Sequence, residues 1–472
     1  MGTFIGTTGT DTIIPGTVSP GVTANTAGSK PSGAADAIDG IGGTDTIDGG
    51  GGADTISFSG AGSVGDGGAG NDTITFRVPA GSGPVSATAN GGAGSDVVAF
   101  DVAYGGGSAS YSGSMSLRGG EGSDTTRGNA AFSFDTSFQN VDVSLYGDRG
   151  NDRIEATTQD AGSSFIPVEG AKNNDFLYGG TGNDTFYVQE QQDVAIENPG
   201  EGTETVVVNN SSTDSYTLAP NVEKLVVRDW YYHISASLTG NATANEITGT
   251  WKADTLDGAG GNDSIYGKPV SETYVGEDDH DTLRGGAGND LIYGAGGPTD
   301  TWDGNDSLYG NEGNDSLYGQ QGNDRLYGQQ GNDRLYGDLG ADTLAGGESR
   351  DRLYGGDGSD RFDYDSVGES LPGSSNRDVI YDFSGIGGGT VSEQIDLSTI
   401  DATAGGGEDA FTFIGTAGFT APGQLRVRDS SANGDTLIQA NTAGPSGAEL
   451  EIVVADGASA AAADWVSEDF VL

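Results

Sequence analysis

The sequence predicts an all-β protein, a solenoid of the parallel β-roll or β-helix type with a β cap at its C-terminal end. Three observations predict this fold. A nine-residue unit recurs through residues 240–293 and 301–363. Each unit ends in a short alternation of polar and apolar residues, which is typical of strands. Helix patterns are nearly absent, since only the alanine run 458–464 suits a short helix. Because such short units bury apolar side chains only against their neighbours, we expect stacked coils.

The composition is far from that of an ordinary globular chain. Glycine supplies 85 of 472 residues, hydrophobic residues make up 34 %, and 70 acidic against 20 basic residues leave a net charge of −50. Such a chain stays disordered unless its carboxylates are neutralised, so a multivalent cation is the expected partner. Nucleic acid and anionic membranes would be repelled. Without cysteine there are no disulfides or zinc–thiolate sites. Neither a cleaved signal peptide nor a membrane span is expected.

The nine-residue unit has a residue type at each position that suits calcium. Glycine stands first and usually fourth, aspartate sixth, an apolar residue eighth and often tyrosine ninth, as in residues 285–293, 310–318, 319–327 and 328–336. Glycine permits left-handed backbone and a close approach to an ion. A carboxylate together with loop carbonyls is the all-oxygen ligand set of Ca²⁺. The sequence therefore predicts several calcium ions in the turns.

Two units would complete one coil, so every eighteenth residue should stack at the strand spacing. This places Asp306, Asp324, Asp342 and Asp360 on one edge and Asp315, Asp333 and Asp351 on the other. The eighth residues should form an apolar ladder inside: Leu308, Leu317, Leu326, Leu335, Leu344, Leu353 and Phe362. In residues 240–293, position six is held by Asp254, Asp263, Asp281 and Asp290, and in two degenerate units by Asn245 and Glu272. The fourth-position glycines Gly288, Gly313, Gly322, Gly331 and Gly340 complete the predicted ligand set.

The first 190 residues carry the same signature more sparsely. Asp36, Asp45 and Asp54 end consecutive units, whereas Asp72, Asp96, Asp124, Asp152 and Asp175 lie 24, 28, 28 and 23 residues apart, and Asp184 follows. We infer a wider solenoid with one calcium-type turn per coil. Residues 191–239 contain no nonapeptide, and 206–208, 216–218 and 222–227 look like strands of an inserted β segment or a bulging coil. Four parts are expected: 1–190, 191–239, 240–363 and a cap at 364–472.

The units GGAGNDLIY (285–293) and GNEGNDSLY (310–318) resemble the nonapeptide of the RTX (repeats-in-toxin) family. Family members fold as parallel β-rolls when Ca²⁺ binds, and leave Gram-negative cells unfolded through type I secretion. The resemblance implies a protein that the type I machinery exports and that is secreted, extracellular or attached to the surface of a Gram-negative bacterium.

Segments 355–364 (GGDGSDRFDY), 378–385 (DVIYDFSG) and 469–472 (DFVL) resemble the C-terminal roll and cap of serralysin-type secreted metalloproteases. There, a final acidic residue followed by apolar ones is an uncleaved export signal, which implies the same role for 469–472. The zinc motif HExxH of that family is missing, since the chain has only His233 and His280, far apart. Peptidase activity is therefore not implied.

No active-site constellation stands out, so we expect a protein that is not an enzyme. The leading expectation is a structural protein of a surface layer or extracellular matrix that assembles through calcium. One alternative is a calcium-dependent adhesin or carbohydrate-binding protein with cell-surface polysaccharide as its partner. Its basis would be the stacked tyrosines Tyr309 and Tyr327 on one face and Tyr318, Tyr336 and Tyr354 on the other. The second alternative is an enzyme that modifies extracellular polysaccharide.

Overall fold

The computed structural model describes residues 3–5, 12–14, 17–18, 23–24, 36–40, 44–59, 62–78, 83–102, 111–131, 141–150, 152–159, 176–188, 193–209, 215–228, 235–269, 280–297, 304–373, 375–384, 393–403, 409–430, 434–444, 447–455 and 461–472. In these residues the chain is built of strands and two 3-10 turns, with no α-helix, which confirms the all-β prediction. None of the described helices is long and apolar enough to cross a membrane. The chain divides into two compact units, Met1–Arg228 and Asp229–Leu472.

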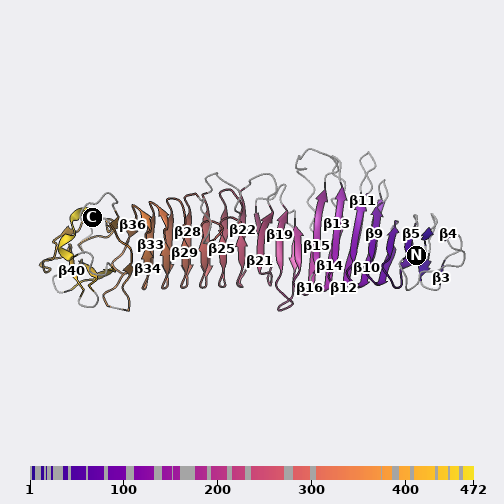
Figure 1. Cartoon of the computed structure of the whole chain (residues 1–472), viewed down its shortest axis with the longest axis horizontal. Coiled ribbons are helices and arrows are strands. Elements are labelled where there is room, and N and C mark those ends of the chain that lie inside the picture. The colour runs from indigo at the N-terminus through magenta and orange to yellow at the C-terminus, as the bar shows by residue number, and fades with distance from the viewer. Residues whose placement is uncertain are drawn as a thin grey trace. The chain divides into compact units, whose positions relative to one another are not determined.

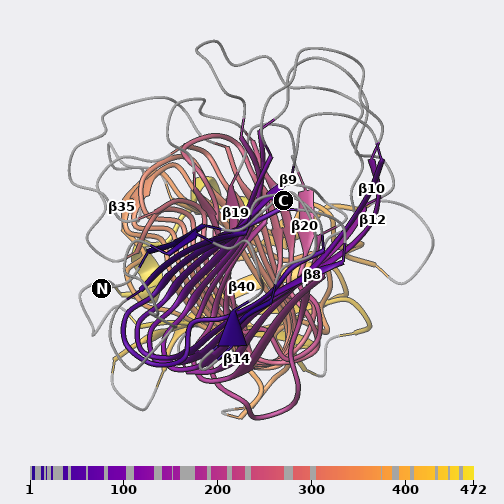
Figure 2. The same cartoon turned by 90° about the vertical axis from the view of Figure 1, so that its right-hand side faces the viewer.

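Unit 1 consists of coils whose strands form two parallel sheets. The first sheet contains β5 (Ala37–Gly40), β7 (Thr55–Phe58), β9 (Thr73–Val78), β11 (Val97–Val102), β13 (Thr125–Ala131), β15 (Arg153–Gln159), β17 (Thr185–Val188), β19 (Thr205–Asn209) and β21 (Lys224–Arg228). The second contains β2 (Thr12–Ile14), β6 (Thr46–Asp48), β8 (Ser63–Ala69), β10 (Gly83–Ala93), β12 (Tyr111–Glu121), β14 (Val141–Arg149), β16 (Phe176–Thr181) and β18 (Val194–Ile196). Seen end-on, β10 and β12 lie one behind the other (Figure 2).

The remaining strands of unit 1 are short. At its start, β1 (Thr3–Ile5) pairs parallel with β5, while β3 (Thr17–Val18) and β4 (Thr23–Ala24) pair antiparallel with β2 and β1. Between β19 and β21 lies β20 (Ser215–Thr217). The three strands expected within 206–227 are thus present, and β19 and β21 continue the first sheet in parallel register.

Apolar side chains at one position of each coil form a column inside unit 1. Strand pairing aligns the threonine Thr126 with eight apolar residues of the first sheet, all at most 2 % exposed: Ile38, Ile56, Ile74, Val98, Ile154, Phe186, Val206 and Leu225. Burying one such aliphatic side chain stabilises the fold by about 1.5–3 kcal/mol. Since successive strand residues point to opposite faces, each strand supplies only one or two of them. The core is therefore thin and continuous along the stack.

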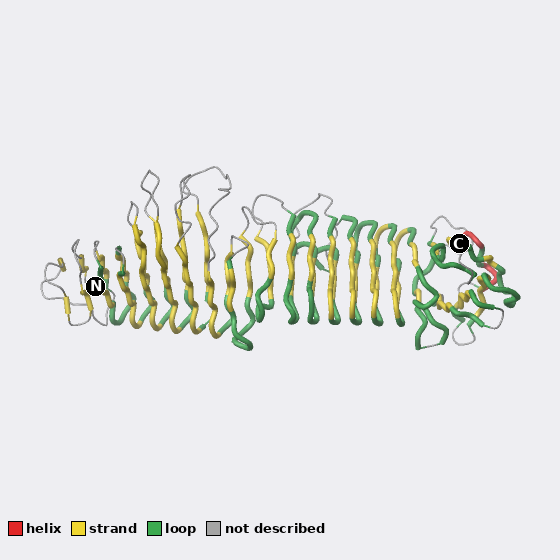
Figure 3. Tube along the Cα trace, turned by 180° about the vertical axis from the view of Figure 1, so that it is seen from behind, coloured by secondary structure: helices red, strands yellow, loops and turns green. Residues whose placement is uncertain are grey.

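Unit 2 repeats this plan with shorter rungs. One sheet contains β23 (Glu246–Thr248), β25 (Ser264–Tyr266), β27 (Leu291–Tyr293), β29 (Ser316–Tyr318), β31 (Arg334–Tyr336), β34 (Arg352–Tyr354) and β37 (Val379–Ile380). The other contains β22 (Ser237–Thr239), β24 (Thr255–Asp257), β26 (Thr282–Ala287), β28 (Ser307–Glu312), β30 (Arg325–Gln330), β33 (Thr343–Glu348), β36 (Arg361–Asp363) and β38 (Gln394–Asp396). In a turn, β32 (Leu339–Gly340) pairs with β35 (Asp357–Gly358). Figures 1 and 3 show these strands as successive rungs joined by turns at both edges.

The predicted apolar ladder of unit 2 is confirmed. Leu308, Leu326, Leu344 and Phe362 align in one sheet, and Leu317, Leu335 and Leu353 align in the other, all with no exposed surface. Every one is the eighth residue of its repeat. The nonapeptide therefore sets both the strand and the face that it buries.

The last part of unit 2 is a cap that continues both sheets. Its elements are β39 (Thr412–Phe413), β40 (Gln424–Asp429), β41 (Thr436–Asn441), β42 (Leu450–Val454), η1 (Ala462–Asp464), η2 (Ser467–Asp469) and β43 (Phe470–Val471). Strands β40, β41 and β42 are antiparallel, β42 pairs with β37, and β43 pairs with β38. Phe383, Trp465 and Phe470 pack their rings together at 5.0 and 5.6 Å between centroids. Covering the last rung in this way removes exposed strand edges, which would invite aggregation.

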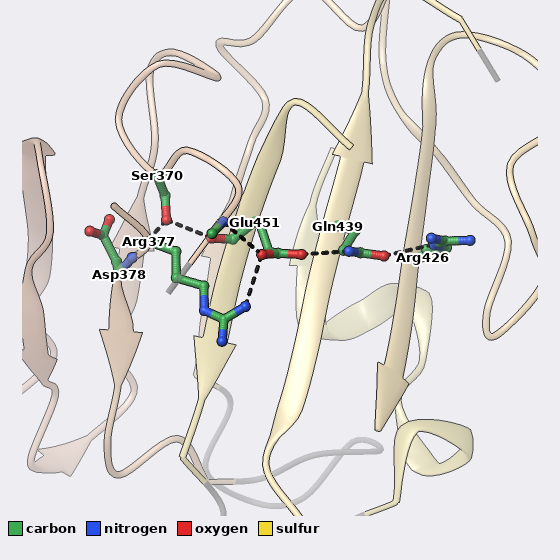
Figure 4. A network of polar contacts seen from close by, with 7 residues as sticks. Ser370, Arg377, Asp378, Arg426, Gln439 and Glu451 are labelled. Atoms are coloured by element: carbon green, nitrogen blue, oxygen red, sulfur yellow. Dashed lines mark hydrogen bonds and ion pairs between the residues drawn. The ribbon is translucent and has the colours of Figure 1, made fainter. Parts of the chain in front are cut away.

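A polar network ties the cap to the last rung (Figure 4). Ser370 Oγ donates to the carbonyl oxygen of Glu451 at 2.7 Å and accepts from the backbone N–H of Asp378 at 2.8 Å. The Glu451 carboxylate accepts from Arg377 Nη1 at 2.8 Å and from Gln439 Nε2 at 2.6 Å. Asp378 also belongs to the turn edge of the repeats, so the network joins the cap to the carboxylates of the turns.

Candidate metal centre

Aspartates at position six of the repeats stack into hydrogen-bonded ladders along both edges of unit 2. The backbone N–H of Asp306 donates to Asp324 Oδ1 at 2.8 Å, and that of Asp324 donates to Asp342 Oδ1 at 2.8 Å. On the other edge the N–H of Asp333 donates to Asp351 Oδ1 at 2.7 Å. One ladder runs through Asp254, Asp281, Asp306, Asp324, Asp342 and Asp360, and the other through Asn245, Asp263, Asp290, Asp315, Asp333, Asp351 and Asp378. The two edges proposed for residues 306–360 are those of the structure.

The second carboxylate oxygen of several ladder aspartates is buried and makes no hydrogen bond. Asp315, Asp333 and Asp351 have no exposed surface, and Oδ2 of each makes no hydrogen bond. The same holds for Oδ2 of Asp263, Asp290, Asp342 and Asp360. Burying a charged oxygen without a partner is costly, so a native fold does not leave it uncompensated. A cation at each Oδ2 is the natural compensation.

The first-position glycines shape the space in front of these oxygens. A Cβ built on Gly319 would lie 2.5 Å from Asp324 Oδ2 and 3.0 Å from the carbonyl oxygen of Gly337, the equivalent glycine one coil on. A Cβ on Gly337 would likewise lie 2.5 Å from both Asp342 Oδ2 and the Gly355 carbonyl oxygen. Carboxylate and carbonyl oxygens therefore converge where only glycine leaves room.

The fourth-position glycines make the tight part of the turn. Gly288, Gly313, Gly322, Gly331 and Gly340 all have φ between 130° and 149°, a region that side chains rarely adopt. A Cβ on Gly340 would overlap the carbonyl oxygen of Gly322 in the preceding coil. These glycines hold neighbouring turns in close contact, so that oxygens from two coils face one another.

Burial makes the ladder carboxylates hard to ionise in the absence of metal. The pKa of Asp315, Asp333 and Asp342 is raised from 3.8 to about 7, first by desolvation and then by the neighbouring carboxylates of the ladder. In each case a backbone N–H bond opposes the rise. A divalent cation would reverse this balance, because it favours the ionised form.

The donor set fits calcium. Ca²⁺ takes six to eight oxygen ligands, from carboxylates and backbone carbonyls. In the part of the chain that the structure describes, no three histidine, aspartate or glutamate side chains cluster in a way that could hold a metal ion. Each site would combine carboxylates with glycine carbonyls, which converge in front of the first-position glycines. The ladder aspartates would neutralise and orient the ion, and the glycine turns would supply the remaining oxygens.

Unit 1 has one such ladder on one edge. Backbone N–H groups donate to Oδ1 of the next aspartate at 2.6–2.8 Å through Asp36, Asp54, Asp72, Asp96, Asp124, Asp152 and Asp184. Asp45 lies outside this series, and its N–H donates to Ser63 Oγ at 3.0 Å. The prediction of one calcium-type turn per coil agrees with this arrangement over residues 54–184.

Two stacking steps differ from the regular spacing of the repeats. Asp152 is followed in the ladder by Asp184 and not by Asp175, which lies outside the described residues. In the block 240–293, stacking every eighteen residues would have paired Asp263 with Asp281. The structure instead pairs Asp263 with Asp290 and Asp254 with Asp281, each 27 residues on. Three nonapeptide lengths separate these rungs. The intervening unit 267–275 has no glycine after Gly267, and its Glu272 lies outside the described residues.

Several carboxylates of the ladders were not found from the sequence. Asp378 extends one ladder of unit 2, accepting from the N–H of Asp351 at 2.8 Å. In unit 1, Glu204 and Glu223 follow Asp184 on the same edge, since the N–H of Glu204 donates to Glu223 Oε2 at 2.9 Å. Neither segment has the nonapeptide pattern. Only the 27-residue step from Asp351 and the three consecutive valines 206–208 after Glu204 could have pointed to them.

The match to one family model agrees with this geometry. The model of the RTX calcium-binding nonapeptide repeat matches residues 32–60, 142–160, 168–195, 239–268, 271–298, 303–335 and 336–366. No curated protein matches the chain. Among solved structures, the AlgE6R2 subunit from the Azotobacter vinelandii mannuronan C5-epimerase is similar, with 22 % identity over 40 % of this chain and 91 % of that one, at a TM-score of 0.24. The AlgE6R3 subunit of the same enzyme is 25 % identical over 43 % of this chain and 85 % of that one, at a TM-score of 0.19. The chain thus carries RTX calcium-binding nonapeptide repeats over these residues, and the repeats imply multiple Ca²⁺ ions bound in its turns.

Proposed function

We propose that the protein is a secreted structural protein of the cell surface, of the surface-layer or extracellular-matrix type, which folds and self-associates when Ca²⁺ binds. RTX repeats are typical of secreted extracellular proteins, and RTX proteins are exported by type I secretion. The observation that supports the proposal is the set of buried carboxylate ladders, with their unpaired oxygens, in both units. They make the fold dependent on a cation that is abundant outside cells.

Because the chain carries a large net negative charge, Ca²⁺ also has a role between molecules. At a net charge of −50, two copies repel each other unless counterions lie between them. Calcium bound at the turns lowers that repulsion in the same step that orders the coils. Association is therefore expected to follow folding and to require calcium as well.

We propose no catalytic role for the ladder carboxylates. A general acid or base needs access to a substrate, whereas Asp333 and Asp351 have no exposed surface and their Oδ1 atoms hold backbone N–H groups. His280 Nδ1 accepts from the backbone N–H of Asn305 at 2.7 Å, as asparagine side chains do elsewhere along the edges. His233 lies outside the described residues. The ladder carboxylates are better explained as structural groups of the stacked coils than as catalytic groups.

Electron microscopy and light scattering of the purified full chain in calcium and in EGTA test the proposal. Calcium is expected to produce β-rich protein that forms lattices, sheets or filaments, and EGTA is expected to return it to disordered single chains. Calcium-loaded protein that stays monodisperse and monomeric at every concentration would contradict the structural role while leaving calcium-dependent folding intact.

A second candidate function is binding of carbohydrate, for which the tyrosine rows are the relevant feature. Tyr318, Tyr336 and Tyr354 stack with centroids 4.6 Å apart and rings nearly parallel, at 2° and 11°. The row continues through Tyr266, Tyr293 and Tyr381. Because the ring faces cover one another, mainly edges are left for a ligand. This favours cross-strand packing over stacking on sugar rings.

A glycan-binding screen decides between these uses of the tyrosines. Under the structural proposal, the calcium-loaded protein and its Tyr327→Ala and Tyr336→Ala variants show no glycan retention that depends on either ring. Retention by the wild type that both variants lose would favour the adhesin alternative.

We also propose residues 469–472 as an export signal, on their resemblance to serralysin-type C-termini. In the folded cap Phe470 is 5 % exposed and pairs with Ile395. A transporter would therefore have to read the segment before the cap folds. Deleting 469–472 should abolish export from a cell with a type I system, and unchanged export would contradict this role. The division into 1–190, 191–239, 240–363 and 364–472 likewise remains a proposal about separable parts.

A further inference from the structure

The segment from Glu197 to Glu204 has no nonapeptide, yet it occupies the next place in the turn edge of unit 1. The first-position glycines there form a column in which a Cβ built on Gly119 would lie 2.8 Å from the carbonyl oxygen of Gly147, and one on Gly147 would lie 2.6 Å from that of Gly179. Strands β16 and β18 pair Tyr178 with Ile196, so the residue stacked on Gly179 is Glu197. A glutamate therefore follows the last glycine of the column.

Glu204, at the end of the segment, occupies the position that an aspartate has in the other turns. The N–H of Thr205 donates to the carbonyl oxygen of Asp184 at 2.9 Å, as the N–H of Thr185 does to that of Asp152 at 2.8 Å. Glu204 precedes Thr205 just as Asp184 precedes Thr185. The N–H of Glu204 then donates to a carboxylate of the next coil, Glu223 Oε2, as the N–H of Asp152 does to Asp184 Oδ1.

The middle of the segment also follows the pattern of the nonapeptide turns. The N–H of Gly182 donates to the carbonyl oxygen of Glu201 at 2.8 Å, and the N–H of Thr203 donates to Asn183 Oδ1 at 3.0 Å. The equivalent bonds join the other turns, for example Gly150 to Thr181 and Ser95 to Asn71. From Glu197 to Glu204 the turn is two residues longer than from Gly179 to Asp184.

Three carboxylates of this turn are buried and have oxygens without partners. Glu197, Glu204 and Asp184 are 7 %, 1 % and 1 % exposed, and Oε2, Oε1 and Oδ2, respectively, make no hydrogen bond. Glu197 Oε2 and Asp184 Oδ2 both point at the position that a Cβ of Gly179 would take. Glu204 Oε1 and the carbonyl oxygen of Gly182 converge in the same way in front of Gly202. Unpaired buried carboxylate oxygens that converge in this way need a cation.

We propose that residues 197–204 form a second kind of calcium-binding turn, in which Glu197 stands where other turns have a glycine and Glu204 where they have the aspartate. Asp184 and Glu197 share one ion, with the carboxylate of Glu197 replacing the carbonyl oxygen that the next glycine supplies elsewhere. The longer glutamate side chains span the wider turn. This inference rests on calcium binding by the protein and does not depend on the proposed role at the cell surface.

Counting bound ions in the full-length calcium-loaded protein tests the site. The double variant Glu197→Gln/Glu204→Gln keeps the shape of both side chains and removes both charges. Native mass spectrometry with Ca²⁺ as the sole added metal is expected to show at least one ion fewer than in the wild type. A control variant, Glu121→Gln/Glu312→Gln, removes two charges from exposed side chains and should keep the wild-type count.

Hydrogen exchange gives a second, local measurement. Calcium should protect amides of β19 and β21 in the wild type and in the control, and protect them less in the double variant. An unchanged count together with unchanged protection in the double variant would overturn the proposal. If that variant does not fold in calcium, the single variant Glu197→Gln tests the proposal by the same ion count and the same hydrogen-exchange measurement.

Discussion

The backbone N–H of Asp333 donates to Oδ1 of Asp351 at 2.7 Å, while Oδ2 of the same buried carboxylate has no hydrogen-bond partner. One side chain thus has two roles: one oxygen fixes the register of two coils, and the other is left for a cation. Removing the cation leaves a buried charge in the contact that holds the coils together. Folding and calcium binding are therefore expected to be coupled at every rung.

Replacing Asp351 by asparagine tests this coupling. The variant keeps an Oδ1 acceptor for the N–H of Asp333 but puts an NH₂ group where the ion needs an oxygen. We expect the affinity of that site for calcium to fall about tenfold or more, with a lower melting temperature in limiting calcium. Calorimetric titration measures the affinity.

Asp357→Asn is the matched control, because Asp357 is exposed and outside the ladders. It should titrate like the wild type. Equal affinities for the two variants would mean that the ladder carboxylates do not bind the ion.

The raised pKa values predict that acid favours the metal-free fold. The pKa of Asp315, Asp333 and Asp342 is about 7 in the fold, against 3.8 for an ordinary aspartate. Since the unfolded chain releases these protons near pH 4 and the fold retains them until about pH 7, the fold loses stability as the pH rises between these values. In calcium-free buffer, circular dichroism should show β-structure increasing as the pH falls from 7 toward 4.

Protons and calcium should also compete. The calcium concentration for half-maximal folding should change with pH, and at acid pH fewer ions should be bound in the folded protein. A metal-free chain that loses its β-structure on mild acidification would contradict the assignment of buried, protonated carboxylates.

A methyl group on a first-position glycine should disrupt its site. A Cβ at Gly319 would lie 2.5 Å from Asp324 Oδ2, so Gly319→Ala is expected to destabilise the calcium-loaded fold by about 1–3 kcal/mol. Chemical unfolding in saturating calcium measures this. Gly418→Ala, where a Cβ would meet nothing within 4 Å, should lie within about 0.5 kcal/mol of the wild type. Similar losses of stability in both variants would show that the space in front of Asp324 Oδ2 is not tightly filled.

The cap depends on Glu451. Burial by itself would raise its pKa, but hydrogen bonds from Gln439 and Arg377 bring the pKa of this carboxyl below its usual value. Glu451→Ala leaves Arg377 without its partner, and we expect a loss of roughly 3 kcal/mol. Unfolding of the calcium-loaded protein provides the measurement, with exposed Glu468→Ala as the control. If the two variants are equally stable, the network in Figure 4 does not hold the cap to the last rung.

Regular spacing made the ladders of residues 306–360 predictable, because position six recurs every nine residues and two units make one coil. The same reasoning failed where coil length changes. The step from Asp263 to Asp290 skips the degenerate unit around Glu272, and no local residue shows which later aspartate will stack. Glu197 and Glu204 were missed for a different reason: a longer turn accepts longer acidic side chains, so the residue types of the nonapeptide disappear while its place in the stack remains.

The ladders also give each stack a direction. In every rung it is the earlier coil that donates its N–H and the later coil that offers its carboxylate, as from Asp306 to Asp324 and from Asp324 to Asp342. The two ends of such a stack are therefore chemically unlike, one presenting acceptors and the other donors. The cap of unit 2 covers the last rung, so copies could not join through that end. The lattice or filament proposed above would have to form through the sides of the coils.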